Sequence, residues 1–194
     1  MRKLLSVSCL SAALLAAGPA AGFHGDGENP LGRGGFALPQ GEWSDDAGVD
    51  GGFGYGINAR LQIFPVISLY GGWEKYTFDT EAETIEASDT GLRGGAHVSV
   101  PLSALTGVSP FAFAGVVYNE TSFKVEEVDG EFEADSEFGY EVGAGVAFPI
   151  APTLSLTPSV RYRAHPAELP AGEAGTDDID VSYLVFDIGL KLGL

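Results

Sequence analysis

The alternation of apolar and polar positions is clearest in the last stretch of the chain, residues 180–194, which read DVSYLVFDIGLKLGL. From Leu184 to Leu194 every second residue is apolar, whereas the positions between them include Asp187 and Lys191. A period of two is the signature of a β-strand with two different faces. Such a strand fits a soluble sandwich, or a membrane barrel whose apolar face meets lipid and whose polar face lines the lumen.

Similar alternation through the rest of the chain predicts an all-β protein of eight strands. The expected strands are residues 33–44, 51–64, 66–79, 90–101, 110–125, 136–148, 153–165 and 180–194. The register of the first is ambiguous because Pro39 interrupts it. Most are longer than the about 5–6 residues typical of globular strands and exceed the about 9–11 that a tilted strand needs to cross a bilayer.

The connections between these strands differ in length and charge. Most of the 27 acidic residues fall in or beside four connections, at residues 45–50, 80–89, 126–135 and 166–178. The alternate connections, at residue 65 and residues 102–109 and 149–152, contain no acidic residue. Outer-membrane barrels have short turns on the periplasmic side and longer loops outside. The pattern therefore favours a transmembrane β-barrel with acidic extracellular loops.

Charged residues in the strands share the polar register, which predicts a charged lumen. A lysine or arginine facing lipid near the bilayer midplane would cost about 2–4 kcal/mol. In the fifth strand this places Glu120, Ser122 and Lys124 inside and turns Phe111, Phe113, Val117 and Phe123 outward. Lys75, near a strand end, is the exception. The predicted lumen charge network consists of Arg60, Glu74, Arg93, His97, Glu120, Lys124, Glu141, Arg161, Arg163, Asp187 and Lys191. His165 shares the same register.

Composition adds a targeting segment and excludes some functions. Residues 1–22 have a charged start, an apolar stretch and small residues at the end, which indicates a cleaved secretory signal. Residues 23–32 then form a flexible lead-in, and residues 33–194 the barrel. The single cysteine, Cys9, lies in the signal, so no disulfide is expected. The net charge of −17 argues against nucleic-acid binding.

Residues 33–194 resemble the small eight-stranded outer-membrane barrels of the outer membrane protein A and X type. The resemblance rests on the signal, the number of strands, the acidic outer loops and the alternating last strand. The resemblance implies an antiparallel up-and-down barrel in a Gram-negative type outer membrane, surrounded by lipid and lipopolysaccharide. It also implies that the barrel assembly machinery recognises the last strand. Members of this family usually end in an aromatic residue, whereas this chain ends in Leu194.

Several functions fit this architecture. An eight-stranded barrel is just wide enough to be filled by side chains, so the network is expected to form salt bridges that close the lumen. The alternative is a narrow ion-conducting pore gated by those bridges. The third possibility is a lipid A-modifying enzyme, because His97 and Ser99 have the His-x-Ser spacing of lipid A deacylases. The predicted register, however, points both side chains into the lumen. A soluble lipocalin-like barrel would need an apolar interior.

No catalytic residue, cofactor or metal site is therefore expected. The acidic loops are interpreted as a solvated rim, or as a surface for an extracellular ligand or for divalent cations, which prefer carboxylate oxygens. Aromatic residues often lie at the membrane–water interface. The candidates for such interface positions are Trp43, Tyr55, Trp73, Tyr140 and Tyr162.

Overall fold

The computed structural model describes residues 31–45, 48–80, 85–100, 107–125, 130–133, 137–171 and 175–192. The expected signal, residues 1–22, and most of the lead-in lie outside this part of the chain. The elements are β1 (Leu31–Gln40), α1 (Glu42–Asp45), β2 (Val49–Phe64), β3 (Ile67–Thr80), β4 (Ile85–Ser99), β5 (Ser109–Val125), β6 (Gly130–Glu133), β7 (Glu137–Ala151), β8 (Leu154–Ala171) and β9 (Gly175–Leu192). None of the described helices is long and apolar enough to cross a bilayer.

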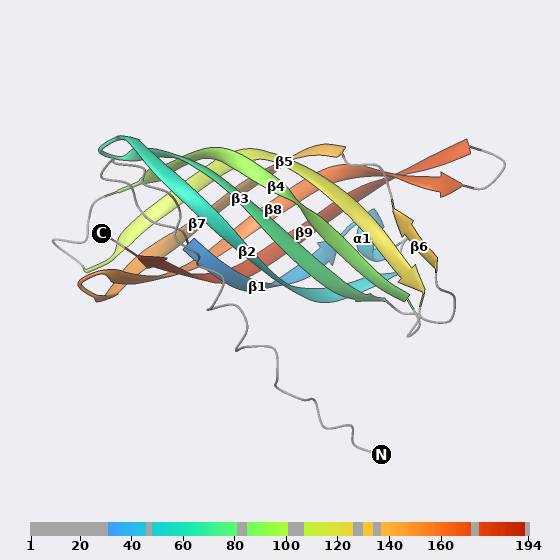
Figure 1. The fold of residues 1–194 in the computed structure, drawn as a ribbon, viewed down its shortest axis with the longest axis horizontal. Helices are drawn as coiled ribbons and strands as arrows, with labels where there is room; N and C mark the ends of the chain where they lie inside the picture. Colours follow the sequence, from blue (N-terminus) through green and yellow to red (C-terminus); the bar gives the residue numbers. More distant parts are fainter. Residues whose placement is uncertain are drawn as a thin grey trace, which may run out of the picture.

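Eight long strands form a closed antiparallel barrel (Figure 1). They pair in the order β4-β3-β2-β1-β9-β8-β7-β5, and the additional pairing of β4 with β5 closes the cylinder. The short β6 is added to one edge of β5. Closure leaves no exposed sheet edge in the wall, which matters most where lipid cannot hydrogen-bond to the backbone. The predicted eight-stranded up-and-down barrel is confirmed.

The two ends of the barrel differ. Tight turns at Pro65–Val66 and Pro152–Thr153 join β2 to β3 and β7 to β8, and we call this side the turn end. At the opposite side, the hairpin end, strands continue into residues expected to be loops: β8 reaches Ala171 and β9 starts at Gly175. The sequence of these extensions carries prolines and acidic residues without a period of two, although the backbone ladder continues.

The first strand also differs from the expected range of 33–44. It begins at Leu31 and ends at Gln40, where Gly41 has a φ of 59° and turns the chain into α1. Gly41 suits this position because a side chain would be strained there. Pro39 is accommodated because the pairing of β1 with β2 has already ended at Ala37 and Gly52.

The outer wall of the barrel is apolar over its whole circumference. Phe53, Phe138 and Ile188 are 73%, 70% and 57% exposed, and Phe186 and Leu190 also face outward. Soluble proteins rarely expose a continuous apolar surface of this kind, whereas a lipid bilayer solvates it. Tyr183, Val185 and Asp187 of the same last strand are buried inside. The predicted orientation of the last strand is therefore correct.

The predicted orientation of β5 is wrong. Phe111, Phe113 and Val117 are buried in the lumen, and Val116 is 60% exposed on the outer wall. This part of the strand, FAFAGVVY, is apolar at both odd and even positions, so alternation could not choose between the two registers.

The inverted register moves two charged residues out of the predicted network. Glu120 and Lys124 are exposed and do not belong to the lumen. The prediction used Glu120 to decide which face of β5 lines the lumen, but Glu120 lies close to the membrane boundary. There an outward charge costs only about 0–1 kcal/mol, so its position carried little information about which face is inside.

The hydrocarbon boundary at the hairpin end is visible in the register. Trp73, Leu92, Tyr118 and Phe138 lie on one rung across β3, β4, β5 and β7. The next outward-facing rung toward the hairpin end carries Lys75, Thr90 and Glu120. Aromatic residues followed by charges mark a membrane–water interface. Tyr55 and Tyr140 are also exposed on the outer wall, whereas Trp43 is buried at the hairpin end and is not an interface residue.

Candidate functional site

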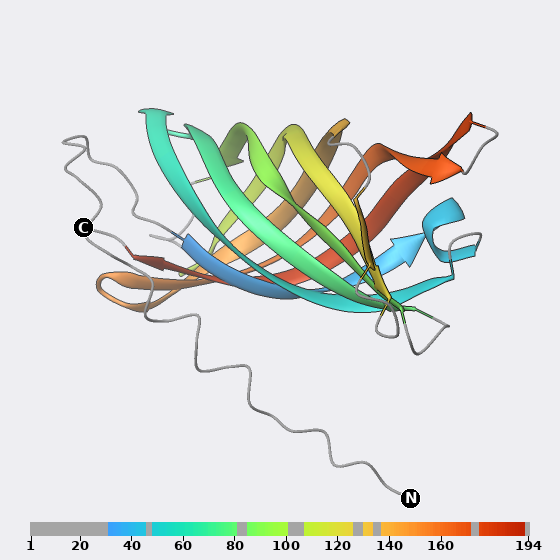
Figure 2. The ribbon, with the colours of Figure 1, turned by 45° about the vertical axis from the view of Figure 1, so that its right-hand side comes forward.

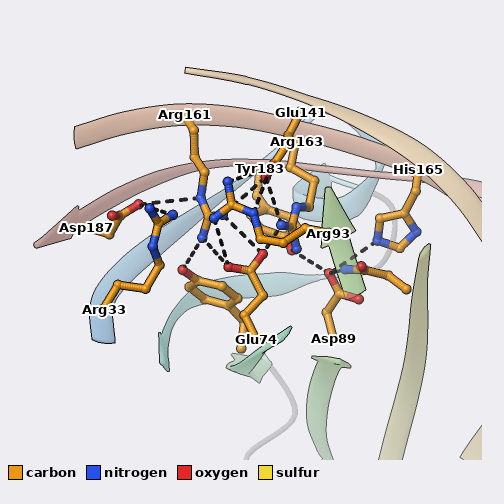
Figure 3. A network of polar contacts seen from close by, with 12 residues as sticks. Arg33, Glu74, Asp89, Arg93, Glu141, Arg161, Arg163, His165, Tyr183 and Asp187 are labelled. Carbon is orange, nitrogen blue, oxygen red and sulfur yellow. Dashed lines mark hydrogen bonds and ion pairs between the residues drawn. The ribbon is translucent and has the colours of Figure 1, made fainter. Parts of the chain in front are cut away.

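The site with the densest chemistry is a cluster of charged side chains in the middle of the lumen (Figure 3). It contains two carboxylates, Glu74 from β3 and Glu141 from β7, and three arginines, Arg93 from β4 with Arg161 and Arg163 from β8. Each of these side chains is at most 2% exposed. Alternation places them inside because each occupies the inward register of its strand.

Glu141 bonds to all three arginines. Its Oε1 accepts hydrogen bonds from Arg93 Nε at 2.7 Å and from the Tyr70 hydroxyl at 2.6 Å. Its Oε2 accepts from Arg161 Nη1 at 3.2 Å and Arg163 Nη2 at 3.0 Å. A buried carboxylate is stable only when it is paired and hydrogen-bonded in this way.

Glu74 holds the same arginines from the opposite side of the lumen. Its Oε2 lies 2.8 Å from Arg161 Nη2 and 3.6 Å from Arg93 Nη1, and its Oε1 accepts a hydrogen bond from Arg163 Nη2. Arg161 also donates to the Tyr76 hydroxyl at 2.5 Å. The two carboxylates and three arginines therefore link β3, β4, β7 and β8 across the barrel.

Toward the turn end the network continues through Asp187 of β9. Its Oδ2 lies 3.5 Å from Arg161 Nε and 3.7 Å from Arg33 Nη1, and its Oδ1 accepts a hydrogen bond from Ser159 at 2.9 Å. Arg33 was missing from the predicted network because the ambiguous first strand gave no register. If the register of β1 had been inferred from the strands that pair with it, Arg33 would have been assigned to the lumen network.

Toward the hairpin end the network reaches Asp89 of β4. Its Oδ2 accepts hydrogen bonds from Tyr183 at 2.5 Å and Asn119 at 2.8 Å, and it lies 3.2 Å from His165 Nε2. Tyr183 in turn accepts from Arg163 Nη1 at 3.2 Å, which joins this group to the central cluster. The sequence pattern placed Asp89 in an acidic loop, although it shares the parity of Arg93.

His165 donates from both ring nitrogens in this arrangement. Its Nδ1 lies 3.0 Å from the carbonyl oxygen of Pro166, which can only accept, and its Nε2 faces the Asp89 carboxylate. An imidazole that meets acceptors on both sides must carry hydrogen on both nitrogens. The geometry therefore indicates a charged imidazolium paired with Asp89.

Aromatic groups close the charged lumen at both ends. At the hairpin end, Trp43 of α1 packs edge-on against Phe78 and Phe123, with ring centroids 6.0 and 5.8 Å apart. At the turn end, Phe111 stacks on His97 at 4.8 Å, and Arg93 lies 5.5 Å from the ring of Phe113. These layers shield the network from water, which strengthens its electrostatic interactions.

The structure brings together most of the predicted network residues. Those in direct contact with one another are Glu74, Arg93, Glu141, Arg161, Arg163 and Asp187. His97 is buried in the lumen but belongs to the aromatic layer. Arg60 and Lys191 lie near the turn end, where they pair with Tyr70 and Ser155 in the backbone register. Glu120 and Lys124 lie on the outer wall.

The charges of the cluster are suited to closing a barrel. Arginine and carboxylate side chains occur in equal numbers: Arg33, Arg93, Arg161 and Arg163 against Glu74, Asp89, Glu141 and Asp187. Within the described part of the chain, no three histidine or acidic side chains converge as ligands for a metal ion. These ion pairs can cross-link the strands of the barrel wall. Ions could pass through the lumen only if the arginines and carboxylates exchanged partners.

An apolar outer wall, a closed antiparallel sheet and a charged, filled lumen define a transmembrane β-barrel protein. The sequence matches the family described as "Outer membrane protein beta-barrel domain" over residues 4–191. The chain belongs to this family, and its place is the outer membrane. A search of curated protein sequences gave no match.

Solved structures show the same fold. Neisserial surface protein A has a TM-score of 0.65 and 14% identity, over 88% of this chain and 98% of its own. The outer membrane protein OprG from Pseudomonas aeruginosa has a TM-score of 0.56 and 13% identity, over 86% and 95%. A major outer membrane protein from Thermus thermophilus has a TM-score of 0.51 and 13% identity, over 84% and 98%.

Proposed function

We propose that this protein is a closed barrel with a structural and surface-interaction role in the outer membrane. One observation carries the proposal: a network of paired charges, buried between two aromatic layers, fills the lumen. A lumen filled in this way holds the barrel wall rigid. The parts of the protein that can contact other molecules are then the strand ends exposed outside the membrane. In this proposal the secretory signal is cleaved, the turn end faces the periplasm and the hairpin end faces the exterior.

The acidic hairpin end supports a role at the cell surface. Asp50, Asp79 and Glu86 are exposed at the ends of their strands, and Asp180 is exposed just past the point where β9 stops pairing with β1. We infer that the rim stays hydrated beside lipopolysaccharide and is available to an extracellular ligand or to divalent cations. The barrel assembly machinery would act only during insertion, through the alternating last strand.

The proposal excludes a lipid-modifying activity at His97 and Ser99. The His97 ring is buried and stacks on Phe111 inside the lumen. A lipid substrate in the bilayer would have to cross the wall to reach it. We therefore assign no catalytic role to this pair, although the spacing of the two residues resembles that of a deacylase.

The orientation is testable by labelling single cysteines on intact cells. The only cysteine of the sequence is Cys9, within the expected signal, so an introduced cysteine reports alone. Asp79→Cys at the hairpin end should react with a membrane-impermeant maleimide, whereas Pro65→Cys at the turn end should react only after lysis. Labelling of Pro65→Cys in intact cells would reverse the orientation and contradict the surface role.

The closed lumen predicts no ion conduction. Purified protein in a planar bilayer should show no resolved current steps, because both ends of the network are covered by aromatic side chains. A general porin inserted under the same conditions is the control. The alternative, a narrow pore gated by lumen salt bridges, predicts steps that change or vanish in Arg161→Gln and Glu141→Gln. Steps of that kind would replace the closed-barrel proposal.

A further inference from the structure

The buried charges of the lumen do not sum to zero when His165 is included. Four arginines face four carboxylates in the network described above. His165 is 3% exposed, and hydrogen-bond acceptors on both sides of its ring give it a positive charge. The buried groups of the network therefore carry one positive charge in excess. Because a buried charge without a counter-charge is costly, this excess favours the uptake of one anion.

Basic residues without acidic neighbours are found toward the turn end, the left-hand side of the barrel in Figures 1 and 2. The parts of the eight strands that lead to this end contain Arg33, Arg60 and Lys191. None of these parts contains an acidic residue; they are residues 31–33, 57–64, 67–73, 94–99, 109–117, 142–151, 154–160 and 188–192. An anion in the lumen is therefore more stable here than beside the acidic residues of the hairpin end.

The guanidinium group of Arg33 is incompletely paired, although the side chain is only 6% exposed. Asp187 Oδ2 lies 3.7 Å from its Nη1, which is too long for a hydrogen bond, and the same oxygen also faces Arg161 Nε at 3.5 Å (Figure 3). The buried Nε and Nη1 atoms of Arg33 have no hydrogen-bond acceptor in the described part of the chain. Buried donors of this kind point to a bound water or ion.

The strand register places a second buried donor close to Arg33. Gly189 of β9 pairs with Arg33 of β1 on one side and with Thr157 of β8 on the other. The Thr157 hydroxyl is buried, and no described residue forms a hydrogen bond with it. Because Gly189 has no side chain, none from β9 stands between Arg33 and Thr157. Their Cα atoms are two strand spacings apart, about 10 Å, so both side chains can contact one small ion.

We propose that a monovalent inorganic anion of the chloride type binds in the lumen between Arg33 and Thr157, over Gly189. A guanidinium group only donates hydrogen bonds and a hydroxyl group can donate one, so the two side chains suit an anion and not a metal cation. A water molecule would satisfy the donors but would leave the excess charge, whereas a single negative charge offsets it. The inference rests on the proposed closed lumen, which shields this charge from water.

Full-length protein refolded and crystallised in sodium bromide provides the first test. Bromide replaces chloride in most sites and scatters X-rays anomalously near its absorption edge. An anomalous difference peak is expected between Arg33 and Thr157. A map with no peak at this position, or with water alone, would overturn the proposal.

The affinity for bromide is measured by urea unfolding in lipid vesicles, with gluconate replacing bromide at constant ionic strength. A bound anion raises the unfolding midpoint as its concentration rises, so the titration gives a dissociation constant. Thr157→Val removes the hydroxyl group but keeps the branched shape, and should raise this constant about tenfold. Arg33→Gln removes the excess charge and should abolish the dependence on bromide.

Thr121→Val is the matched control. The Thr121 hydroxyl is also buried without a hydrogen-bond partner among the described residues, but Thr121 pairs with Asp89 at the hairpin end. Its replacement should change the dissociation constant of bromide less than about twofold. Equal effects of the two valine variants, or a bromide dependence that persists in Arg33→Gln, would indicate a general salt effect and overturn the proposal.

The anion site and the closed lumen can fail separately, because none of these readouts measures conductance. Loss of the bromide peak would leave the predicted lack of ion conduction intact. Current steps in a planar bilayer would contradict the closed lumen even if bromide bound at Arg33.

Discussion

Replacement of Glu141 with alanine is expected to lower the free energy of unfolding by about 3–5 kcal/mol, the usual cost of leaving a buried charge without its partner. Glu141 bonds to Arg93, Arg161 and Arg163. In the variant only Glu74 would still contact all three guanidinium groups, and Asp187 would contact Arg161. Urea unfolding in lipid vesicles, followed by heat-modifiable gel migration, measures the loss.

The control for this variant is Glu120→Ala. The two glutamates were equivalent in the predicted network, but Glu120 is exposed on the outer wall. Its removal should change the free energy of unfolding by no more than about 0.5 kcal/mol. A large loss in Glu120→Ala with little effect in Glu141→Ala would show that the described orientations of β5 and β7 are wrong.

Replacement of Phe113 with alanine is expected to cost about 3–5 kcal/mol of unfolding free energy. The side chain is 5% exposed and packs edge-on against Tyr70 with ring centroids 5.9 Å apart. Its loss would leave a cavity next to the charged cluster and weaken the aromatic layer at the turn end. The same vesicle unfolding assay applies.

Val116→Ala is the matched variant on the opposite face of β5. Val116 is 60% exposed toward lipid, and lipid chains can fill the space that the smaller side chain leaves. We expect a loss below about 1 kcal/mol. If Val116→Ala proved more harmful than Phe113→Ala, the outward register predicted from the sequence for Phe113 would be correct after all.

The predictions from sequence succeeded where one strand face meets lipid and the other meets charge. In β9 the contrast between Leu190 and Asp187 fixes the register, because either residue would be costly on the wrong face. The same contrast placed Glu74, Arg93, Glu141 and Arg161 inside. The number of strands followed from the repeated alternation and from the positions of the turns.

The predictions failed where that contrast is absent. In β5 apolar residues occupy both faces over residues 111–118, and the charge at Glu120 lies beyond the hydrocarbon boundary. In β1 the expected strand offered too little alternation to reveal that Arg33 faces Asp187. At the hairpin end, residues 166–171 and 175–178 carry prolines and acidic residues without a period of two, so they looked like loop although they are paired.

The sequence by itself determined a membrane barrel with a charged interior, because lipid imposes a strict period of two on every strand that crosses it. Only the tertiary structure decided which arginine meets which carboxylate, that Trp43 closes the hairpin end, and that β8 and β9 stay paired with each other beyond the wall. Those properties depend on register between strands distant in sequence. A one-dimensional pattern specifies which face of a strand is buried, but not which residue lies opposite across the lumen.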